Sequence, residues 1–203
     1  SIDLGGSALK AAIVADSGEV IASAEDRVTT YMLSKGGAEQ DPEEWWTLAC
    51  IAIKRVKKEA NVSRTQIKGI GISYQMHGLV LVDEKGSVLR KSIIWCDSRA
   101  VEIGKTAHEE IGAGKCDREL LNSPANFTAS KLKWVQMNEP DLYGRIYKFM
   151  LPGDYIAYRL TGKINTTISG LSEGIFWNFK KKEPASFLLD YFGISEDLIP
   201  DIT

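Results

Sequence analysis

Apolar and polar positions along residues 1–28 follow the pattern of a small antiparallel sheet. Ile2–Leu4 and Ala8–Ala15 are apolar runs on either side of a glycine-rich bend, and Val20–Val28 follows a turn at Asp16-Ser17-Gly18-Glu19. Residues 8–15 also have helix-forming composition, but the turn and the strand-like residues after it favour a hairpin. The pattern therefore predicts three antiparallel strands rather than the strand-to-helix step of a dinucleotide-binding or P-loop fold.

A helix is predicted next by its capping residues and its apolar period. Asp41 is a good N-cap, Pro42 fits the first helical position, and acidic residues occupy the first turn. Apolar side chains then recur at helical spacing for about five turns, and Asn61 marks the end. We expect an amphipathic helix here.

The rest of the chain alternates between strand-like and helix-like patterns. Strands are predicted at Ile67–Ser73 (buried), Leu79–Val82, Val88–Leu89, Ile93–Trp95 and Ile146–Leu151, with the second and third paired across the Asp83–Gly86 turn. Helices are predicted from Ala100 to Ile111, from a cap at Thr128 to a stop before Pro140, and from Pro152 to Leu160. The order predicts an α/β domain with a mixed sheet, which starts with an antiparallel hairpin and continues with alternating helices and strands.

Composition is that of an ordinary globular protein. Of the 203 residues, 44% are apolar and 26% are charged, which suits a sizeable core in one domain or two small ones. The net charge is −2, and the basic residues are scattered apart from Lys180–Lys182, so we expect no nucleic-acid partner.

The compartment is indicated by the cysteines and by the absence of targeting patterns. Cys50, Cys96 and Cys116 form an odd set without CxxC spacing, which is typical of free thiols rather than of disulfides or a zinc site. No stretch approaches the roughly 18 apolar residues of a membrane span, and no signal-peptide pattern is present. We expect a soluble cytoplasmic protein without a membrane partner.

Gln75-Met76-His77-Gly78 interrupts two apolar, strand-like runs with bulky polar side chains. A tight hairpin would favour Asn-Gly or Asp-Gly, which supply positive φ angles. The quartet is therefore interpreted as a set of side chains presented at a strand end. The alternative is an ordinary polar loop in which His77 bonds to the backbone.

Four polar clusters lie at the ends of predicted strands or in loops. Strand ends are where open α/β sheets bind ligands. They are Asp3-Leu4-Gly5-Gly6-Ser7, Gln40-Asp41-Pro42, the quartet, and Trp95-Cys96-Asp97-Ser98-Arg99. With Trp45-Trp46, Phe127–Val135 and Leu151–Tyr155, their sequence and order resemble the N-terminal half of the FGGY carbohydrate kinases, from Ile2 to about Asn178. The Gln-Met-His-Gly sequence is most similar to that of the xylulokinases within that family.

The resemblance implies an actin-like, ribonuclease-H-like fold with two lobes around a cleft. It also implies transfer of the γ-phosphoryl group of ATP, with Mg²⁺, to a sugar hydroxyl, which for xylulokinases is O5 of D-xylulose. Such a reaction asks a protein mainly for positioning and charge neutralisation. A homodimer is a possible assembly, because dimers are common in the family.

On the phosphate side, the resemblance assigns roles to the first hairpin. Asp3 is expected to hold hydrated Mg²⁺, because hard cations prefer carboxylate and water ligands. Gly5 and Gly6 let backbone N–H groups approach phosphate, with Ser7 as a further donor, although a strand bulge is the alternative. Lys10 is a candidate charge partner for phosphate, but a solvated strand residue is the stronger interpretation.

On the sugar side, the resemblance places Met76, His77 and Gln75 against the ketose. His77 would exchange hydrogen bonds with hydroxyls, and Met76 would pack on a carbon face. Trp95 offers a flat wall for the sugar, with a buried core tryptophan as the alternative. Asp97 and Arg99 are expected to bond hydroxyls, to pair with each other or to cap the following helix, and Gln40 is expected to shape the same cleft. Two other polar residues are not assigned to the sugar site: Asp41 is interpreted as an N-cap and His108 as a surface residue.

Two positions depart from the family pattern. Gly6 stands where the family commonly has Thr, so one side-chain contact to phosphate is either lost or supplied by Ser7. The family's general base is an Asp in a glycine-rich segment of the second lobe, and nothing between Thr161 and Thr203 matches it. We therefore expect residues 1–203 to be an N-terminal, sugar-binding lobe that lacks kinase activity alone. Another FGGY kinase, for a ketose, pentitol or gluconate, and a catalytically silent sugar-binding module are the alternatives.

Overall fold

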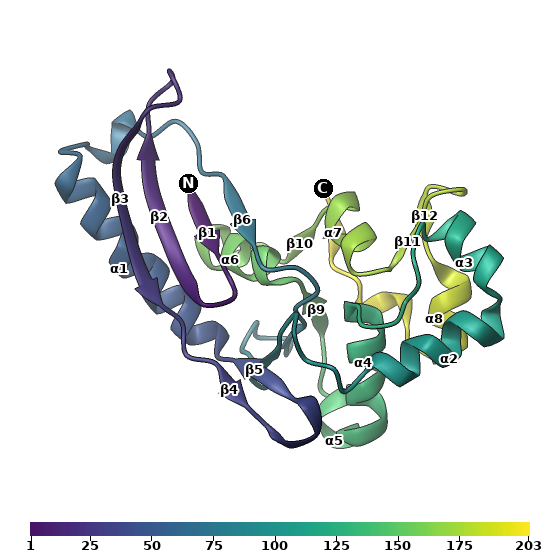
Figure 1. The fold of residues 1–203 in the computed structure, drawn as a ribbon. Coiled ribbons are helices and arrows are strands. Elements are labelled where there is room, and N and C mark those ends of the chain that lie inside the picture. Colours follow the sequence, from purple (N-terminus) through teal and green to yellow (C-terminus); the bar gives the residue numbers. More distant parts are fainter.

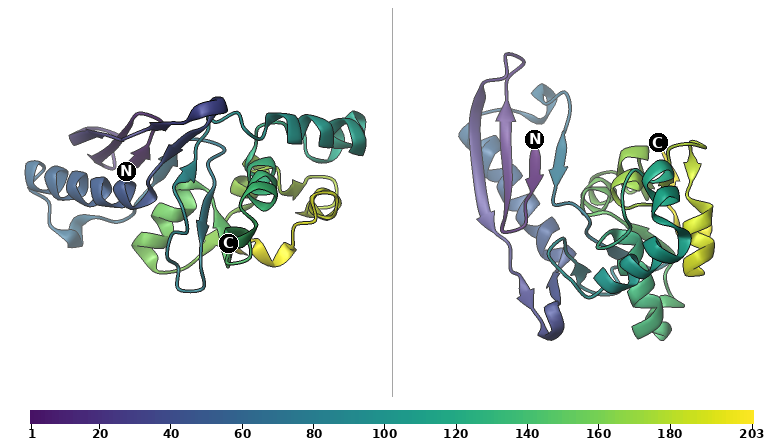
Figure 2. Two further views of the ribbon diagram at one scale, coloured as in Figure 1. Left: turned by 90° about the horizontal axis from the view of Figure 1, so that it is seen from below. Right: turned by 45° about the vertical axis from the view of Figure 1, so that its right-hand side comes forward.

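The computed structural model describes all residues from Ser1 to Thr203. The first half of the chain forms a sheet covered by a long helix, and most of the second half forms a helical layer beside it (Figure 1). The segment that follows strand β6 (Ile72–Tyr74) runs between the two halves in both turned views (Figure 2). The quartet lies in this segment.

The N-terminal sheet has the strand order β3-β2-β1-β6. Its strands β1 (Ile2–Leu4), β2 (Ala8–Val14) and β3 (Val20–Arg27) are antiparallel, as predicted, and β6 adds in parallel to β1. Helix α1 (Pro42–Glu59) packs on β2 and β3, and the Asp41 carboxylate caps it by accepting the Glu43 N–H. The predicted mixed sheet and the predicted cap are confirmed.

The remaining elements are short. The strands are β4 (Tyr31–Met32), β5 (Ala38–Gln40), β7 (Val80–Val82), β8 (Ser92–Ile93), β9 (Lys148–Met150), β10 (Asn165–Thr166), β11 (Trp177–Asn178), β12 (Glu183–Pro184) and β13 (Asp201–Ile202). The helices are α2 (Val101–Ile111), α3 (Ala113–Glu119), α4 (Thr128–Asn138), α5 (Pro140–Tyr143), α6 (Pro152–Thr161), α7 (Ile168–Glu173) and α8 (Ser186–Phe192). Three 3₁₀ turns lie at Ser34–Gly36, Arg64–Gln66 and Glu196–Leu198.

Strand β7 separates two hydrophobic cores. Leu79 and Leu81 belong to a core of 21 buried residues on the helical side, and Val80 and Val82 belong to a core of 18 buried residues under the sheet. Successive side chains of a strand point to opposite faces, so both faces of this strand are buried. The continuous apolar run after the quartet is explained by this position, which also anchors one end of the quartet.

Several predicted elements differ from the structure. The predicted buried strand Ile67–Ser73 is wrong in extent and burial, because only Ile72–Tyr74 is a strand and none of its residues is fully buried. Its partner β1 begins at Ile2, opposite Ile72, so residues 67–71 lie beyond the end of the neighbouring strand. The Asp83–Gly86 turn forms, but Val88 makes only an isolated bridge to Val82, and the main partner of β7 is β9.

The predicted helix cap at Thr128 is also wrong. Phe127 occupies the N-cap position, and the Thr128 hydroxyl instead donates to the Gly78 carbonyl at 3.4 Å. The three cysteines are free thiols, as predicted. None of the helices has both the length and the apolar character that crossing a membrane requires.

Candidate active site

The quartet begins at the edge where β1 and β6 end together. The Gln75 N–H donates to the Leu4 carbonyl at 2.7 Å, so the quartet starts directly beside the glycine-rich bend. Gln75 is buried, whereas Met76 is 54% exposed. His77 is half-buried and has a φ angle of 59°, a left-handed conformation that is uncommon outside glycine. The sequence-predicted sugar and phosphate clusters are therefore neighbours.

Two side chains of opposite charge hold the His77 backbone. Its N–H donates to the Glu173 carboxylate at 2.7 Å, and its carbonyl accepts from Lys131 Nζ at 2.7 Å. Lys131 has no exposed surface, and burial lowers its pKa to about 8. Burial also raises the pKa of Glu173. We call Lys131 and Glu173 the His77 clamp, because together they fix a strained backbone conformation that would otherwise relax.

The His77 ring lies edge-on against Phe127, with ring centroids 4.1 Å apart. Burial, and then the nearby Lys131 charge, lower the pKa of His77 to about 4, so the imidazole is neutral at physiological pH. A neutral imidazole has one donor and one acceptor nitrogen. The buried Nδ1 has no hydrogen-bond partner. The alternative interpretation, in which the ring is bonded to backbone, is therefore not what the structure has.

Trp95 lies on the loop after β8 and is 48% exposed, so the alternative of a buried core tryptophan is wrong. Its indole ring faces the glycine-rich bend: a methyl group added to Gly6 would lie only 2.6 Å from the indole Nε1. The Trp95 carbonyl accepts a long hydrogen bond of 3.4 Å from the Asn126 amide. Trp95 is thus positioned beside the glycine-rich bend.

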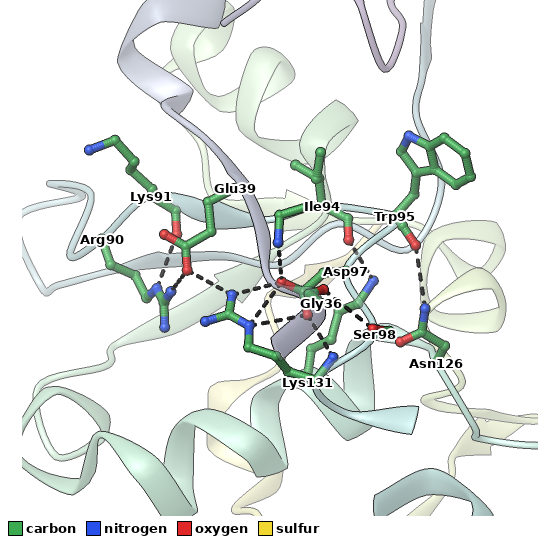
Figure 3. Close-up of polar contacts among 12 residues, drawn as sticks. Gly36, Glu39, Arg90, Lys91, Ile94, Trp95, Asp97, Ser98, Asn126 and Lys131 are labelled. Atoms are coloured by element: carbon green, nitrogen blue, oxygen red, sulfur yellow. Dashed lines mark hydrogen bonds and ion pairs between the residues drawn. The ribbon is translucent and has the colours of Figure 1, made fainter. Parts of the chain in front are cut away.

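Asp97 and Arg99 form a buried ion pair, one of the three roles predicted for them. Asp97 has no exposed surface, and its carboxylate accepts the Ala38 N–H at 2.7 Å, the Arg99 N–H at 2.9 Å and the Arg99 guanidinium at 2.7 Å. Arg99 also bonds to Glu39 at 2.7 Å, and Glu39 pairs with Arg90. Figure 3 shows this network beneath the Trp95 loop, with the indole pointing away from it.

The helix-capping role of Asp97 is wrong, because α2 begins at Val101 and its N-cap, Ala100, has no side-chain cap. A direct sugar contact by Asp97 also disagrees with its complete burial. The guanidinium of Arg99 stacks over Trp134 at 4.4 Å, which leaves it a packing role. The pair therefore supports the loop that carries Trp95.

Gln40 connects the polar clusters of the site through its side chain, and the cleft-shaping role expected of it stays a prediction. It is fully buried, and its Nε2 donates to the Gly6 carbonyl at 2.8 Å and to the Thr30 hydroxyl at 2.9 Å. Its Oε1 accepts from Trp45 at 2.9 Å and from the Gln75 amide at 2.8 Å. Gln40 thereby joins the quartet to the glycine-rich bend. The Gln75 amide nitrogen is committed to this bond, whereas its buried Oε1 has no hydrogen-bond partner.

The glycine-rich bend keeps unused donors. The Gly5 N–H bonds to the Ala8 carbonyl at 2.9 Å, but the N–H groups of Gly6 and Ser7 donate to no group of the chain. Lys10 is exposed and pairs with Glu25 at 3.6 Å, as expected of a solvated strand residue. Free N–H groups in a turn are an arrangement that binds anions.

Asp3 is exposed, and one carboxylate oxygen accepts the Ser73 hydroxyl at 2.8 Å. No cluster of three or more His, Cys, Asp or Glu side chains that could enclose a metal exists in the chain. A single free carboxylate oxygen suits Mg²⁺ nevertheless, because this ion keeps several waters and takes its other ligands from phosphates. Asp3 therefore fits a hydrated Mg²⁺ beside the bend.

The His77 clamp is the part of the site that the sequence prediction missed. Lysine and glutamate in helices usually lie on the surface. One signal was present: Lys131 occupies the same helical stripe as Thr128, Leu132 and Val135, all of which are buried. A charged residue within an apolar stripe indicates a buried partner.

Known proteins resemble this chain in sequence and in fold. The N-terminal domain model of the FGGY family of carbohydrate kinases matches residues 1–203. A xylulose kinase of Bacillus subtilis is 34% identical over 201 residues, which are 99% of this chain and 40% of that protein. The chain thus spans about 40% of the length of this relative.

Solved structures of carbohydrate kinases also superpose on this chain. The xylulose kinase of Rhodospirillum rubrum superposes with a TM-score of 0.91 at 25% identity, over 100% of this chain and 42% of that one. A gluconate kinase from Lactobacillus acidophilus superposes with a TM-score of 0.86 at 25% identity, over 100% and 41%. These superpositions confirm the predicted actin-like, ribonuclease-H-like α/β fold with a mixed sheet.

Proposed function

Because the chain belongs to the FGGY family of carbohydrate kinases, we propose that the full-length protein phosphorylates D-xylulose at O5 with ATP. The chain is its N-terminal lobe and supplies the sugar wall and the first phosphate loop. One observation carries the proposal: Met76 and Trp95 are exposed, His77 is neutral, and the quartet and Trp95 both adjoin the bend that carries the free amides of Gly6 and Ser7. The xylulose kinase relative at 34% identity supports the choice of sugar.

The sugar is held by one polar and two apolar surfaces in this proposal. The neutral His77 imidazole exchanges hydrogen bonds with hydroxyl groups without repelling Mg²⁺, as an imidazolium would. The exposed faces of Met76 and Trp95 cover the C–H surface of the ketose. The His77 clamp keeps the imidazole in place, so little ordering is left for the moment of binding.

The phosphates lie over the bend. The free N–H groups of Gly6 and Ser7 donate to phosphate oxygens, and Asp3 holds a water-ligated Mg²⁺ beside them. The ion, when bound, neutralises phosphate charge. The general base and the adenine pocket belong to a second lobe, as the family pattern implies, so residues 1–203 alone bind sugar without turning it over.

A substrate panel tests the proposal. The full-length protein is assayed for ATP consumption with D-xylulose, other ketoses, pentitols and gluconate, and D-xylulose is expected to give the highest kcat/KM. Equal or better turnover of gluconate would make gluconate the proposed substrate in place of D-xylulose. Gluconate is included because a gluconate kinase shares this fold at 25% identity. Sugar binding by calorimetry without turnover of any sugar would instead identify a catalytically silent sugar-binding module.

A further inference from the structure

The indole of Trp95 presents its N–H corner to the glycine-rich bend. A methyl group on Gly6 would lie 2.6 Å from Nε1 and 3.5 Å from both Cδ1 and Cε2. Nε1 is therefore the nearest indole atom, and the six-membered ring lies farther away. The absence of a side chain at Gly6 is what allows the indole N–H to reach the bend.

This indole N–H has no partner. No hydrogen bond in the structure uses Trp95 Nε1, and the residue is 48% exposed, so the group is open to a ligand. The N–H groups of Gly6 and Ser7, directly beside it, are also free. Three N–H groups without hydrogen-bond partners, those of the Trp95 indole and of the Gly6 and Ser7 backbone, therefore lie next to one another at the bend. An indole N–H can only donate, so the matching ligand is rich in acceptors.

We propose that Trp95 is a catalytic residue whose indole N–H donates to an oxygen of the phosphoryl group being transferred. The inference rests on the proposed kinase function and adds a donor that the sugar-wall role of Trp95 does not include. Terminal phosphate oxygens are charged and accept only, whereas sugar hydroxyls are neutral and also need acceptors. The three donors around Gly6 suit the phosphoryl group better than the sugar.

The indole acts during the displacement at phosphorus. The sugar hydroxyl oxygen forms a bond to the γ-phosphorus, the bond from that phosphorus to the β–γ bridging oxygen breaks, and ADP leaves with its electron pair. The hydroxyl proton passes to the base of the second lobe. The Trp95 N–H stays on the indole throughout and stabilises charge on a non-bridging oxygen, as a preorganised donor does.

Trp95→Phe in the full-length protein separates the donor from the wall, because phenylalanine keeps an aromatic face and lacks the N–H. We expect kcat to fall about 10- to 100-fold, the effect of losing one hydrogen bond to a charged group. The KM for D-xylulose should change less than about threefold. Trp46→Phe, on helix α1 under Arg159, is the matched control and should leave both constants unchanged.

Two kinetic results would overturn the proposal. One is a higher KM for the sugar with unchanged kcat, which would place the N–H on the sugar. The other is a Trp95→Phe enzyme whose kcat and KM equal those of Trp46→Phe.

If the wild-type protein turns over none of the sugars, the proposed function fails, and nucleotide binding alone then tests the inference. Trp95→Phe should then weaken the β,γ-imido analogue of ATP about tenfold and leave ADP unchanged; equal losses for both nucleotides, or none, would overturn the proposal.

A double-mutant cycle tests the contact between the two residues. Gly6→Ala places a methyl group where it collides with the indole N–H corner, so it should lower kcat by displacing Trp95. The backbone at Gly6 does not have a positive φ angle, so alanine adds no backbone strain there and its effect comes from the indole contact. In the Trp95→Phe background, Gly6→Ala should have a smaller effect than in the wild type. Equal effects in the two backgrounds would contradict a shared contact.

Discussion

The Nζ atom of Lys131 lies 2.7 Å from the carbonyl oxygen of His77 and 3.0 Å from that of Ile94. One buried ammonium group therefore joins helix α4 to the quartet and to Ile94, the residue that follows β8 and precedes Trp95. Because a fixed donor holds both carbonyls, the distance between the two walls of the proposed sugar site is set by this lysine.

Removing the lysine should open that site. Lys131→Met keeps the length and volume of the side chain but leaves the His77 carbonyl without a donor, at a cost of about 1–3 kcal/mol, while the Ile94 carbonyl keeps the Asp97 N–H. We expect KM for D-xylulose in the full-length protein to rise about tenfold, because the loss of one hydrogen bond leaves His77 less well positioned for the sugar. The control is Lys133→Met, whose Nζ bonds to the Phe192 carbonyl away from the quartet. Similar KM values in the two variants would contradict a positioning role.

Glu173 should act through its acceptor rather than through its charge. Glu173→Gln keeps an oxygen for the His77 N–H, so the sugar KM should rise less than about threefold, whereas Glu173→Leu removes the acceptor and should raise it about tenfold. Rescue by the conservative variant distinguishes positioning of His77 from general destabilisation. Thermal unfolding of both variants gives the folded fraction for correction. A glutamine variant as impaired as the leucine variant would show that the carboxylate charge is needed.

His77 should remain neutral across the working pH range. Its pKa is lowered to about 4, so the imidazole is protonated only below that value. The chain has two histidines, so its imidazole Hε1 protons give two NMR signals, and His108→Gln identifies the one from His77. We expect this signal to show no titration between pH 5.5 and 8, given an ordinary pKa of about 6.5. A midpoint within that interval would show that the ring is more hydrated than its packing on Phe127 indicates.

The same neutrality has a kinetic consequence. His77→Ala should raise the sugar KM with little loss of folding, because the ring is half-buried and its backbone bonds to Glu173 and Lys131 remain. The ratio of the variant and wild-type KM values should be constant between pH 5.5 and 8.

Much of this arrangement is readable in the sequence, because it depends on local patterns. The hairpin start follows from the apolar alternation and its turn, and the Asp41 cap from Asp-Pro-Glu-Glu. The exposure of Met76 and Trp95 on the loops after their strands agrees with what strand ends and a family resemblance predict. What local patterns cannot supply is the set of partners across the chain.

Asp97, Gln40 and Lys131 show the physical reason. Each is polar, and polarity alone predicts exposure or a ligand, yet all three are fully buried. Their partners are Ala38, Gly6 and His77, which lie 59, 34 and 54 residues away. Burial of a polar group is tolerated only with such partners, and tertiary packing, not local sequence, provides them.

Asp154 should make stability depend on pH. Burial raises its pKa to about 6 from an ordinary 3.8, against the opposing effect of hydrogen bonds from the Leu151 N–H and the Thr166 hydroxyl. The folded state therefore binds this proton more tightly than the unfolded state does. The resulting stabilisation is complete below about pH 4 and is lost as pH rises through 6, a change of about 3 kcal/mol at 1.36 kcal/mol per pKa unit.

The variant Asp154→Asn tests this dependence, because asparagine is neutral and can accept the same two bonds. We expect it to be about 1–3 kcal/mol more stable than the wild-type chain at pH 7.5 and no more stable at pH 4, from urea unfolding at several pH values. Glu173 also has a raised pKa and interacts with Asp154, so Glu173→Gln is titrated in parallel. A stability difference that is constant with pH would contradict the raised pKa.

Asp97 should matter for stability and not for sugar affinity. Asp97→Ala would leave the Ala38 N–H and the Arg99 guanidinium without their main acceptor, at a cost of about 3–5 kcal/mol for a broken buried ion pair. Asp97→Asn keeps an acceptor for Ala38 and should lose less. Asp117→Asn, an exposed acid beside His108, is the control and should be neutral. Once corrected for the folded fraction, the sugar KM of Asp97→Asn should stay within about threefold of the wild type, because Asp97 has no exposed surface that a sugar hydroxyl could reach. A tenfold higher KM with unchanged unfolding would instead make Asp97 a sugar ligand and require the Trp95 loop to open when the sugar binds.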